Sequence, residues 1–527
     1  MRLRSNLLPL LAVATALAAG GCKSRAPAAY QGEGKLIAGG PAREVIAAPG
    51  GGALAWLANP DLAKDRGHNA PDHMYMGTAT FSAMGPPVVL GRDVATLPGS
   101  FFFSPTGAQV GAITGWSFKK QAGTLVIGDV ASSRARGVAE GVSFFAFSAD
   151  GAQLGYVASG VLWVGPADGS GDFRKIAEEI ATFEFAPDGR TLAARRRGLG
   201  GGQLMIARLA EDVQIQVLGD RVAEYRWSPD GSRLAYTARN DTGAMDLYLE
   251  KPGSPPVRVG KNVPAFRFAS KGGHLAFIGD VSPKKQFGDL FVLPSGAAVA
   301  AKVGEGVTEF EFDPTGERIA WLDKYSPQSR GGALTWAKVS PNPEHHKLGP
   351  NVPSFVWSND GRHLAYVQRQ LSPIFSIDLF LAKAAEGEEA AKIAQGVFGY
   401  SFSGDDERLF FRTQCTRNGR ACELRSAAVA DPTEAISVAR AIHTYEPANG
   451  DGSVLLVTYA RTDADALDLA VVPADGSAPP HMLDQRVLAG TKIVQGKAPG
   501  IAYAVLDPAR LGVYLAEVPS SFAAPAP

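Results

Sequence analysis

Residues that commonly perform catalysis do not form a recognisable catalytic arrangement in this sequence. The Gly-x-Ser-x-Gly motif that exposes a serine nucleophile is absent, and the nearest segment, residues 399–404 (Gly-Tyr-Ser-Phe-Ser-Gly), has a different spacing. Among the histidines, His68 and His73 lie five positions apart, and His345 and His346 are adjacent. Adjacent residues of an extended chain point to opposite sides, and no Cys/His pair has zinc-ligand spacing. We therefore expect no catalytic residue, no metal site and no cofactor, and we interpret both histidine pairs as parts of surface loops.

Two of the three cysteines are placed to form a disulfide. Cys415 and Cys422 enclose six residues that centre on Asn418-Gly419, the strongest short-range signal for a two-residue hairpin. With Asn418 and Gly419 as the turn, the two cysteines lie directly opposite each other, with Cα atoms about 4.5–5.5 Å apart. That separation is within disulfide range, so we predict the bond. The alternative is a pair of free thiols on a hairpin.

The third cysteine follows a segment with the composition of an export signal. Arg2 and Arg4 precede an apolar run, Leu7–Ala19, which is too short to span a bilayer as a mature helix. Small residues, Ala-Gly-Gly, then come directly before Cys22. This order resembles the bacterial lipoprotein signal, and the resemblance implies that residues 1–21 are removed and that Cys22 is lipidated. The alternative is an ordinary secretory signal.

The same resemblance implies a location. In enterobacterial sorting, a residue other than Asp after the lipidated cysteine favours the outer membrane, and Lys23 stands there. We therefore expect a lipid-anchored protein of the outer membrane that faces the periplasm or the cell surface. Residues 22–34 are rich in Ala, Pro and Gly without periodicity, which predicts a flexible tether. Residues 519–527 read as a disordered Ala/Pro tail.

The charge balance argues against nucleic acid as a partner. Lys and Arg together number 52, as do Asp and Glu, so there is no basic excess. One short basic run, residues 195–197 (Arg-Arg-Arg), precedes a glycine-rich stretch, residues 198–202, that lacks the strand–helix context of a phosphate loop. This run could meet an acidic partner or phosphate, or it could be a solvated loop.

A strand–turn–strand motif recurs along the chain and organises all of these residues. Its clearest copy, residues 225–236, reads Tyr-Arg-Trp-Ser-Pro-Asp-Gly-Ser-Arg-Leu-Ala-Tyr. Proline suits the second turn position, and glycine takes the positive φ that follows. The turn residues of the copies are Pro105, Gly107, Asp150, Gly151, Pro187, Asp188, Gly189, Pro229, Asp230, Gly231, Pro314, Gly316, Asp360 and Gly361.

The spacing of the motif predicts a β-propeller. Its glycines stand at 107, 151, 189, 231, 273, 316 and 361, which gives steps of 44, 38, 42, 42, 43 and 45 residues. A four-stranded propeller blade takes about 40–50 residues. A third strand follows each hairpin, as in Asp246-Leu247-Tyr248-Leu249, and a short fourth strand ends near glycine. We therefore predict an all-β protein with about eleven four-stranded units over residues 35–518. Because four to eight blades are typical, one large ring and two rings both stay open.

The two ends of the repeat region complement each other. The last unit ends after residues 513–517 without a fourth strand, and the region begins with a lone strand around Leu36–Ala38. We infer that this N-terminal strand completes the last unit, since such closure removes the exposed edge of a sheet array.

The recurring Phe-x-(Phe/Trp)-Ser-Pro-Asp-Gly-x-x-Leu-Ala-(Tyr/Phe) pattern resembles TolB-like β-propeller repeats, the Pro-Asp relatives of the WD class. The resemblance covers roughly residues 100–415. It implies the fold and says little about function. Because repeats start by about residue 35, the separate α/β domain of TolB has no counterpart here, and a role in the Tol system is not implied.

These observations lead to two functional hypotheses. The first is a lipid-anchored cell-envelope propeller that binds envelope proteins as a scaffold, without catalysis. The alternative is an enzyme or ligand binder that is centred on the channel and acts on envelope or extracellular glycans or peptides.

Overall fold

The fold is all-β, as the sequence predicts. The computed structural model describes residues 32–63, 74–251, 254–281, 287–371, 376–385, 389–462, 466–494, 500–519 and 522. These residues form strands and turns, and none of them is helical. Accordingly, no helix long and apolar enough to cross a membrane occurs in this part of the chain. The signal segment, Cys22, most of the expected tether, and His68 and His73 lie outside the described residues.

Within the described residues, five sheets contain four antiparallel strands each. Their strands are β2 (Ala42–Ala47), β3 (Leu54–Leu62), β4 (Tyr75–Ser82) and β5 (Val88–Ala95); β20 (Ala265–Phe268), β21 (Leu275–Gly279), β22 (Gly288–Leu293) and β23 (Ala301–Val307); β24 (Glu309–Phe312), β25 (Arg318–Ser326), β26 (Gly331–Lys338) and β27 (His346–Val352); β28 (Ser354–Trp357), β29 (His363–Gln370), β30 (Ser376–Lys383) and β31 (Ala391–Gln395); and β32 (Tyr400–Phe402), β33 (Arg408–Thr413), β34 (Cys422–Ala428) and β35 (Ala435–Ile442).

Two further sheets have seven strands in the described part of the chain because one long strand is shared. The first contains β6 (Phe101–Phe103), β7 (Gln109–Ser117), β8 (Ala122–Asp129), β9 (Arg134–Phe147), β10 (Gln153–Ala158), β11 (Val161–Pro166) and β12 (Arg174–Ala177). The second contains β13 (Ile180–Phe185), β14 (Thr191–Arg196), β15 (Gly202–Arg208), β16 (Gln214–Trp227), β17 (Leu234–Arg239), β18 (Met245–Glu250) and β19 (Val257–Gly260). The first half of β9 pairs with β8 and its second half pairs with β10. β16 bridges β15 and β17 in the same way.

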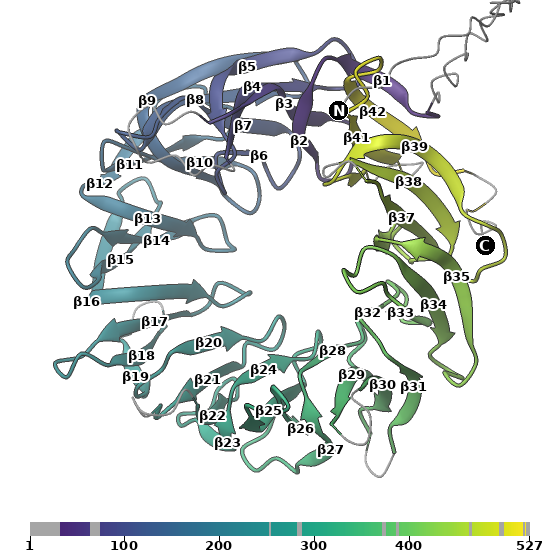
Figure 1. The fold of residues 1–527 in the computed structure, drawn as a ribbon. Coiled ribbons are helices and arrows are strands. Elements are labelled where there is room, and N and C mark those ends of the chain that lie inside the picture. The colour runs from purple at the N-terminus through teal and green to yellow at the C-terminus, as the bar shows by residue number, and fades with distance from the viewer. Residues whose placement is uncertain are drawn as a thin grey trace, which may run out of the picture.

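The last sheet joins the two ends of the described chain. It contains β36 (Thr444–Pro447), β37 (Val454–Ala460), β38 (Ala466–Pro473), β39 (His481–Leu488), β40 (Lys492–Val494), β41 (Gly500–Val505), β42 (Gly512–Glu517) and β1 (Lys35–Gly39). The expected pairing of the N-terminal strand is observed, because β1 runs antiparallel to β42 with Leu36 opposite Tyr514. Figure 1 shows β1 beside β42 at the point where the first and last sheets meet.

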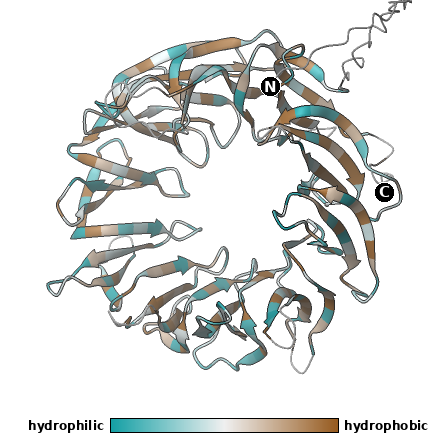
Figure 2. Ribbon diagram, in the orientation of Figure 1, coloured by the Kyte–Doolittle hydropathy of each residue, from teal (hydrophilic) through white to brown (hydrophobic). Residues whose placement is uncertain are grey.

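Neighbouring sheets pack face to face around a central opening (Figure 1). Apolar residues line the strands, and hydrophilic residues gather in the loops (Figure 2). A recurrent alanine in the second strand is fully buried and lets adjacent sheets come close, as at Ala235, Ala320 and Ala365. One core cluster joins the first and last sheets by packing Leu54 and Trp56 with Val513 and other apolar side chains.

The fourth strand of each sheet ends in a repeated bulge that the sequence pattern did not reveal. A residue with positive φ stands there, and a buried Val or Ile follows it. The pairs are Asp93-Val94, Gly141-Val142, Glu179-Ile180, Arg221-Val222, Asn262-Val263, Gly306-Val307, Asn351-Val352, Gly396-Val397, Ala441-Ile442 and Arg486-Val487. The left-handed residue turns the chain out of one sheet, and the aliphatic residue anchors the start of the next.

Two segments that the sequence suggested to be unstructured include packed residues. Glu33, near the end of the expected tether, donates its backbone N–H to the carbonyl of Leu483 at 3.0 Å. Phe522, in the expected disordered tail, packs edge-on against His481 and contacts the core of the last sheet. The apolar side chain of Phe522 explains this docking, because it stands alone in a run of Ala and Pro.

Candidate functional site

The recurrent turn has the geometry that its residues predict. In the clearest copy, the Gly231 N–H donates to the Ser228 carbonyl at 2.8 Å, and Gly231 has a φ of 69°. The Ser228 hydroxyl donates to Asp230 Oδ1 at 2.6 Å and accepts the Arg233 N–H at 3.0 Å. The Ser228 hydrogen bond lowers the pKa of Asp230. Serine and aspartate in this motif therefore hold the turn together.

The other copies repeat this arrangement with small substitutions. Ser148 with Asp150, Ser358 with Asp360, and Ser403 with Asp405 make the same hydroxyl–carboxylate bond. In one copy the two roles are exchanged, so that Thr315 donates to Asp313. The copy without glycine is closed by Asp406, which takes a φ of 62°. In another copy Ala186 replaces the serine, and the Gly189 N–H still bonds the Ala186 carbonyl at 2.9 Å, so the backbone bond closes the turn without the hydroxyl.

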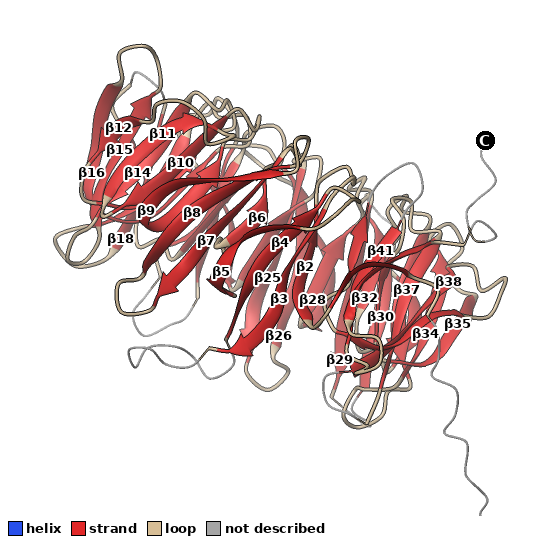
Figure 3. Cartoon of the chain, turned by 90° about the horizontal axis from the view of Figure 1, so that it is seen from above, coloured by secondary structure: helices blue, strands red, loops and turns tan. Residues whose placement is uncertain are grey.

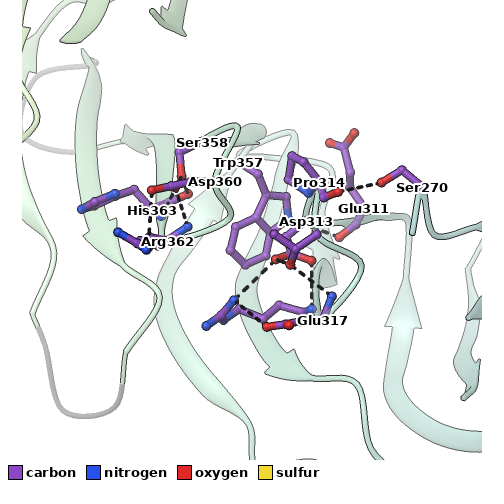
Figure 4. A network of polar contacts seen from close by, with 12 residues as sticks. Ser270, Glu311, Asp313, Pro314, Glu317, Trp357, Ser358, Asp360, Arg362 and His363 are labelled. Atoms are coloured by element: carbon purple, nitrogen blue, oxygen red, sulfur yellow. Dashed lines mark hydrogen bonds and ion pairs between the residues drawn. The ribbon is translucent and has the colours of Figure 1, made fainter. Parts of the chain in front are cut away.

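Successive turns pack on one another and form a continuous edge, which we call the turn rim (residues 104–109, 148–153, 186–191, 228–233, 269–274, 313–318, 358–363 and 403–408). The Gln153 amide donates to the Gly189 carbonyl at 2.8 Å, and the Ser270 hydroxyl donates to the Pro314 carbonyl at 2.9 Å. The Asn359 N–H donates to Asp406 Oδ1 at 2.8 Å. Figure 4 shows three successive turns, around Ser270, Asp313 and Asp360. The predicted turn residues therefore close each turn, and carbonyls such as those of Gly189 and Pro314 also bond the neighbouring turn.

Gly361→Ala is expected to destabilise the protein by about 2–3 kcal/mol. Gly361 has a φ of 71°, and a methyl group there would collide with the Asp313 carboxylate of the preceding turn. Gly396→Ala is the matched control, since Gly396 has a φ of 68° and open space around it. Backbone strain alone should cost the control about 1 kcal/mol. Equal losses for both variants in urea unfolding would contradict contact between successive turns.

The predicted disulfide between Cys415 and Cys422 is present, and their Cα atoms lie 4.0 Å apart. The predicted turn between them is wrong. The Gly419 N–H bonds the Thr416 carbonyl at 2.8 Å, so Arg417 and Asn418 are the central residues. The Thr416 hydroxyl donates to the Asn418 side chain at 2.8 Å, as serine does to aspartate in the repeated turn. This bond favours a copy of the repeat turn over the two-residue hairpin.

Removing this disulfide should cost about 2 kcal/mol, because the closed loop is short. We expect the Cys415→Ala/Cys422→Ala double variant to unfold at lower urea than the wild type. Reductant should lower the midpoint of the wild type toward that of the variant and leave the variant unchanged. A wild-type midpoint that does not respond to reductant, despite complete reduction shown by mass, would contradict a stabilising role.

The opposite end of the sheets is built differently. We call it the crossover face; it is formed by the loops between second and third strands and by the connections from each sheet to the next. Seen from the side, the strands run between two ends at which turns and loops gather (Figure 3). Four clefts along the described residues open at the crossover face. They lie at residues 59–93 (270 Å³), 159–197 (470 Å³), 243–281 (280 Å³) and 443–492 (360 Å³).

An aspartate at the start of the third strand supports this face. Asp246 accepts the Asn262 N–H at 3.4 Å and pairs with Arg258 at 3.3 Å. In another sheet, Asp378 pairs with Lys392 at 2.7 Å. Both aspartates are buried, since Asp246 is 3% exposed and Asp378 is 2% exposed. Each aspartate thus ties the third strand to the fourth, where the bulge begins. The contacts of this aspartate explain why the third strands begin with Asp-Leu-(Tyr/Phe), as in Asp246-Leu247-Tyr248.

Charged side chains line the first strands of the sheets from β13 to β24, and first strands lie nearest the central opening, as β20 and β28 show (Figure 1). Arg267 pairs with Glu311 of the next sheet at 3.5 Å, and Arg226 pairs with Glu224 at 3.3 Å. Among the described residues, no group of three or more His, Cys, Asp or Glu side chains is arranged to hold a metal ion.

The adjacent histidines and the arginine run that the sequence analysis singled out lie on or beside the strands. His345 is exposed and lies in the loop before β27, as expected, with its ring edge-on against Trp321. His346 instead belongs to β27 and stacks on Trp336. In the arginine run, Arg195 donates to the Val222 carbonyl at 3.3 Å and Arg196 to Gln203 at 3.1 Å. Arg197 borders the cleft at residues 159–197, beside Glu178 and Glu179.

The comparisons with known proteins assign no family. No protein-family model matches the chain, and no curated protein matches it. Among solved structures it is similar to a eukaryotic initiation factor (11% identity, 72% of this chain and 96% of that chain, TM-score 0.41). It is also similar to Kuenenia stuttgartiensis hydrazine synthase (13% identity, 55% of this chain and 97% of that chain, TM-score 0.29). A third similar structure is the tricorn protease (12% identity, 91% of this chain and 57% of that chain, TM-score 0.32).

The cleft at residues 443–492 is the candidate site that the sequence did not reveal. His443, Thr444 and Glu446 come from the segment of β36, Thr458 from β37, and Lys492 from β40. These residues belong to the weakest copies of the repeat. No motif marked this cleft, because its lining comes from several segments that are separate in the sequence.

Proposed function

We propose that the chain is a single β-propeller of eleven four-stranded blades. The five four-stranded sheets, the two halves of each seven-stranded sheet and the two halves of the last sheet add up to eleven units. Core clusters between successive sheets support one continuous round, and so does the cluster that joins the last sheet to the first. The pairing of β1 with β42 supports closure by the N-terminal strand.

The function that we propose for this propeller is a non-catalytic scaffold, anchored by a lipid on Cys22, that binds proteins of the bacterial cell envelope. The observation that carries this proposal is the difference between the two ends of the sheets. Turns are packed and hydrogen-bonded to each other at the turn rim, whereas clefts open at the crossover face. Loops held on a rigid array of sheets are suited to partner binding. Partners should therefore contact the crossover face.

Site-specific photo-crosslinking in intact cells tests this proposal. A photoreactive residue in place of Lys261, which is exposed at the crossover face, should give crosslinked species that mass spectrometry identifies as envelope proteins. The same residue in place of Ser232, which is exposed on the turn rim, is the matched control and should give few. Crosslinks at Ser232 alone, or none to any other protein from either position, would count against the scaffold.

The anchor is tested separately. Labelled fatty acid should be incorporated into the wild-type chain and not into a Cys22→Ser variant, and the label should fractionate with the outer membrane. Label that is retained in the variant would reject Cys22 as the acceptor. Label in the inner membrane would reject the expected location.

The charged side chains on the first strands from β13 to β24 favour one alternative, a channel-centred enzyme or ligand binder for glycans or peptides. Arg226, Arg267 and Glu311 would present both signs of charge to such a substrate. Turnover of envelope polysaccharide or peptide by the pure protein, lost in an Arg267→Ala variant, would favour this alternative over the scaffold.

A further inference from the structure

The cleft at residues 443–492 has the features of a small-ligand site. It has a volume of 360 Å³ and lies where the short strand β40 follows the crossover from β39. Small-molecule sites have volumes of about 300–1,000 Å³ and combine an apolar lining with a few polar groups. Leu467 and Leu488, which are half-buried, supply the accessible apolar part of this lining, whereas Leu469 and Val487 lie beneath it in the core.

Polar groups with unused hydrogen-bonding capacity converge on the same cleft. Thr458 is 7% exposed, and its hydroxyl lies 2.7 Å from the Thr444 hydroxyl. Two hydroxyls that bond each other retain a free hydrogen or free lone pairs for a third partner. The Thr458 hydroxyl also accepts the Thr444 N–H at 3.1 Å, so the capacity left for a ligand lies mainly on the exposed Thr444 hydroxyl.

Opposite charges stand on the two first strands that border the cleft. Glu446 on β36 accepts a hydrogen bond from Thr491 at 3.1 Å and is exposed. Lys492 on β40 is also exposed. No ion pair within 4.0 Å joins these two side chains in the described structure, although many other Lys and Arg side chains are paired. A carboxylate and an ammonium group that line one cleft without pairing leave room for a ligand that carries both charges.

We propose that this cleft binds a free α-amino acid with an aliphatic side chain. The ammonium group of the ligand would be recognised by Glu446 and the threonine hydroxyls, and its carboxylate by Lys492. The side chain would lie on the half-buried Leu467 and Leu488. The cleft at residues 243–281 offers no such pair of charges, and the cleft at residues 159–197 offers Val161 as its one aliphatic side chain. The cleft at residues 59–93 carries both charges and the exposed Leu62, but it lacks a pair of bonded threonine hydroxyls. The proposal is independent of the scaffold function.

Calorimetric titration of the intact soluble chain with L-leucine tests the proposal. We expect saturable binding with a Kd between about 10 µM and 1 mM. Leucinamide lacks the carboxylate and N-acetyl-leucine lacks the ammonium group, so each should bind at least about tenfold more weakly. Glycyl-leucine separates the two charges and should also bind weakly. Lack of saturable binding up to about 10 mM L-leucine would overturn the proposal, and so would equal binding of the blocked compounds.

Matched variants locate the site. Glu446→Gln and Lys492→Ala should each weaken L-leucine binding about tenfold, and both residues are exposed, so folding should be kept. Lys261→Ala is the control, because Lys261 is an exposed lysine at another crossover, and it should change Kd less than about twofold. Circular dichroism confirms that each variant is folded. Unchanged binding in both cleft variants would overturn the assignment of the site.

Discussion

A chain that begins at Gly40 is expected to lose about 3–5 kcal/mol of stability relative to one that begins at Gly32. The shorter chain lacks β1, which pairs with β42 at Lys35, Leu36, Ala38 and Gly39 and packs Ile37 and Ala38 on the core shared by the first and last sheets. Both chains lack the lipid and most of the tether. The difference in their urea unfolding therefore reports on the closing strand together with Glu33, which bonds Leu483 and His481 of the last sheet.

The lost strand should be replaceable from outside. A sheet edge with unpaired N–H and C=O groups accepts an added strand. A synthetic peptide covering residues 32–40 should restore most of the lost stability to the chain that begins at Gly40. A peptide of the same composition in scrambled order is the control. Equal stability of the two chains, or no response to the native peptide, would contradict closure by β1.

Replacing Glu250 with glutamine is expected to stabilise the protein by up to about 3 kcal/mol above pH 8. Glu250 ends β18 and is fully buried, and neither carboxylate oxygen has a hydrogen-bond partner among the described residues. The corresponding positions of other third strands carry buried alanines, namely Ala207, Ala337, Ala382 and Ala427. Burial raises the pKa of Glu250 to about 7, and nearby Arg208 opposes this shift.

The pH dependence of this effect has a definite sign. The ordinary pKa of the carboxyl is 4.5, so between pH 4.5 and about 7 the folded protein binds more protons at Glu250 than the unfolded chain. Stability therefore falls as pH rises through this window and levels off above it. Denaturant titrations at a series of pH values should show this fall in the wild type and a smaller one in Glu250→Gln. Glu211→Gln, at an exposed site, is the control. Parallel curves for wild type and Glu250→Gln would contradict the burial of an unpartnered carboxylate.

Local features of the fold could be predicted from the sequence because short segments determine them. The Ser-Pro-Asp-Gly turn is closed by bonds within six residues, so its residue types were sufficient. The register of Cys415 and Cys422 was also correct, although the turn between them was assigned to the wrong residues. The pairing of β1 with β42 could be inferred because the last sheet lacked a strand.

Features that depend on contacts between sheets could not be predicted in this way. The turn rim rests on bonds between residues about one repeat apart, such as Asn359 with Asp406, and neither residue signals its partner. The left-handed position of the bulge is filled by residues as different as Glu179, Arg221 and Asn262, so no residue type marks it. The cleft at residues 443–492 combines segments that are separate in the sequence, so no single motif marks it.

The central proposal is that one closed ring of eleven four-stranded blades is sealed by the N-terminal strand. Electron cryo-microscopy of the purified chain tests it most directly, through class averages viewed along the axis of the ring. We expect a single ring of eleven blades around one central opening, with residues 35–39 on the outer edge of the blade that carries β42. Two smaller rings, another number of blades, or an open crescent with residues 35–39 unpaired would contradict it.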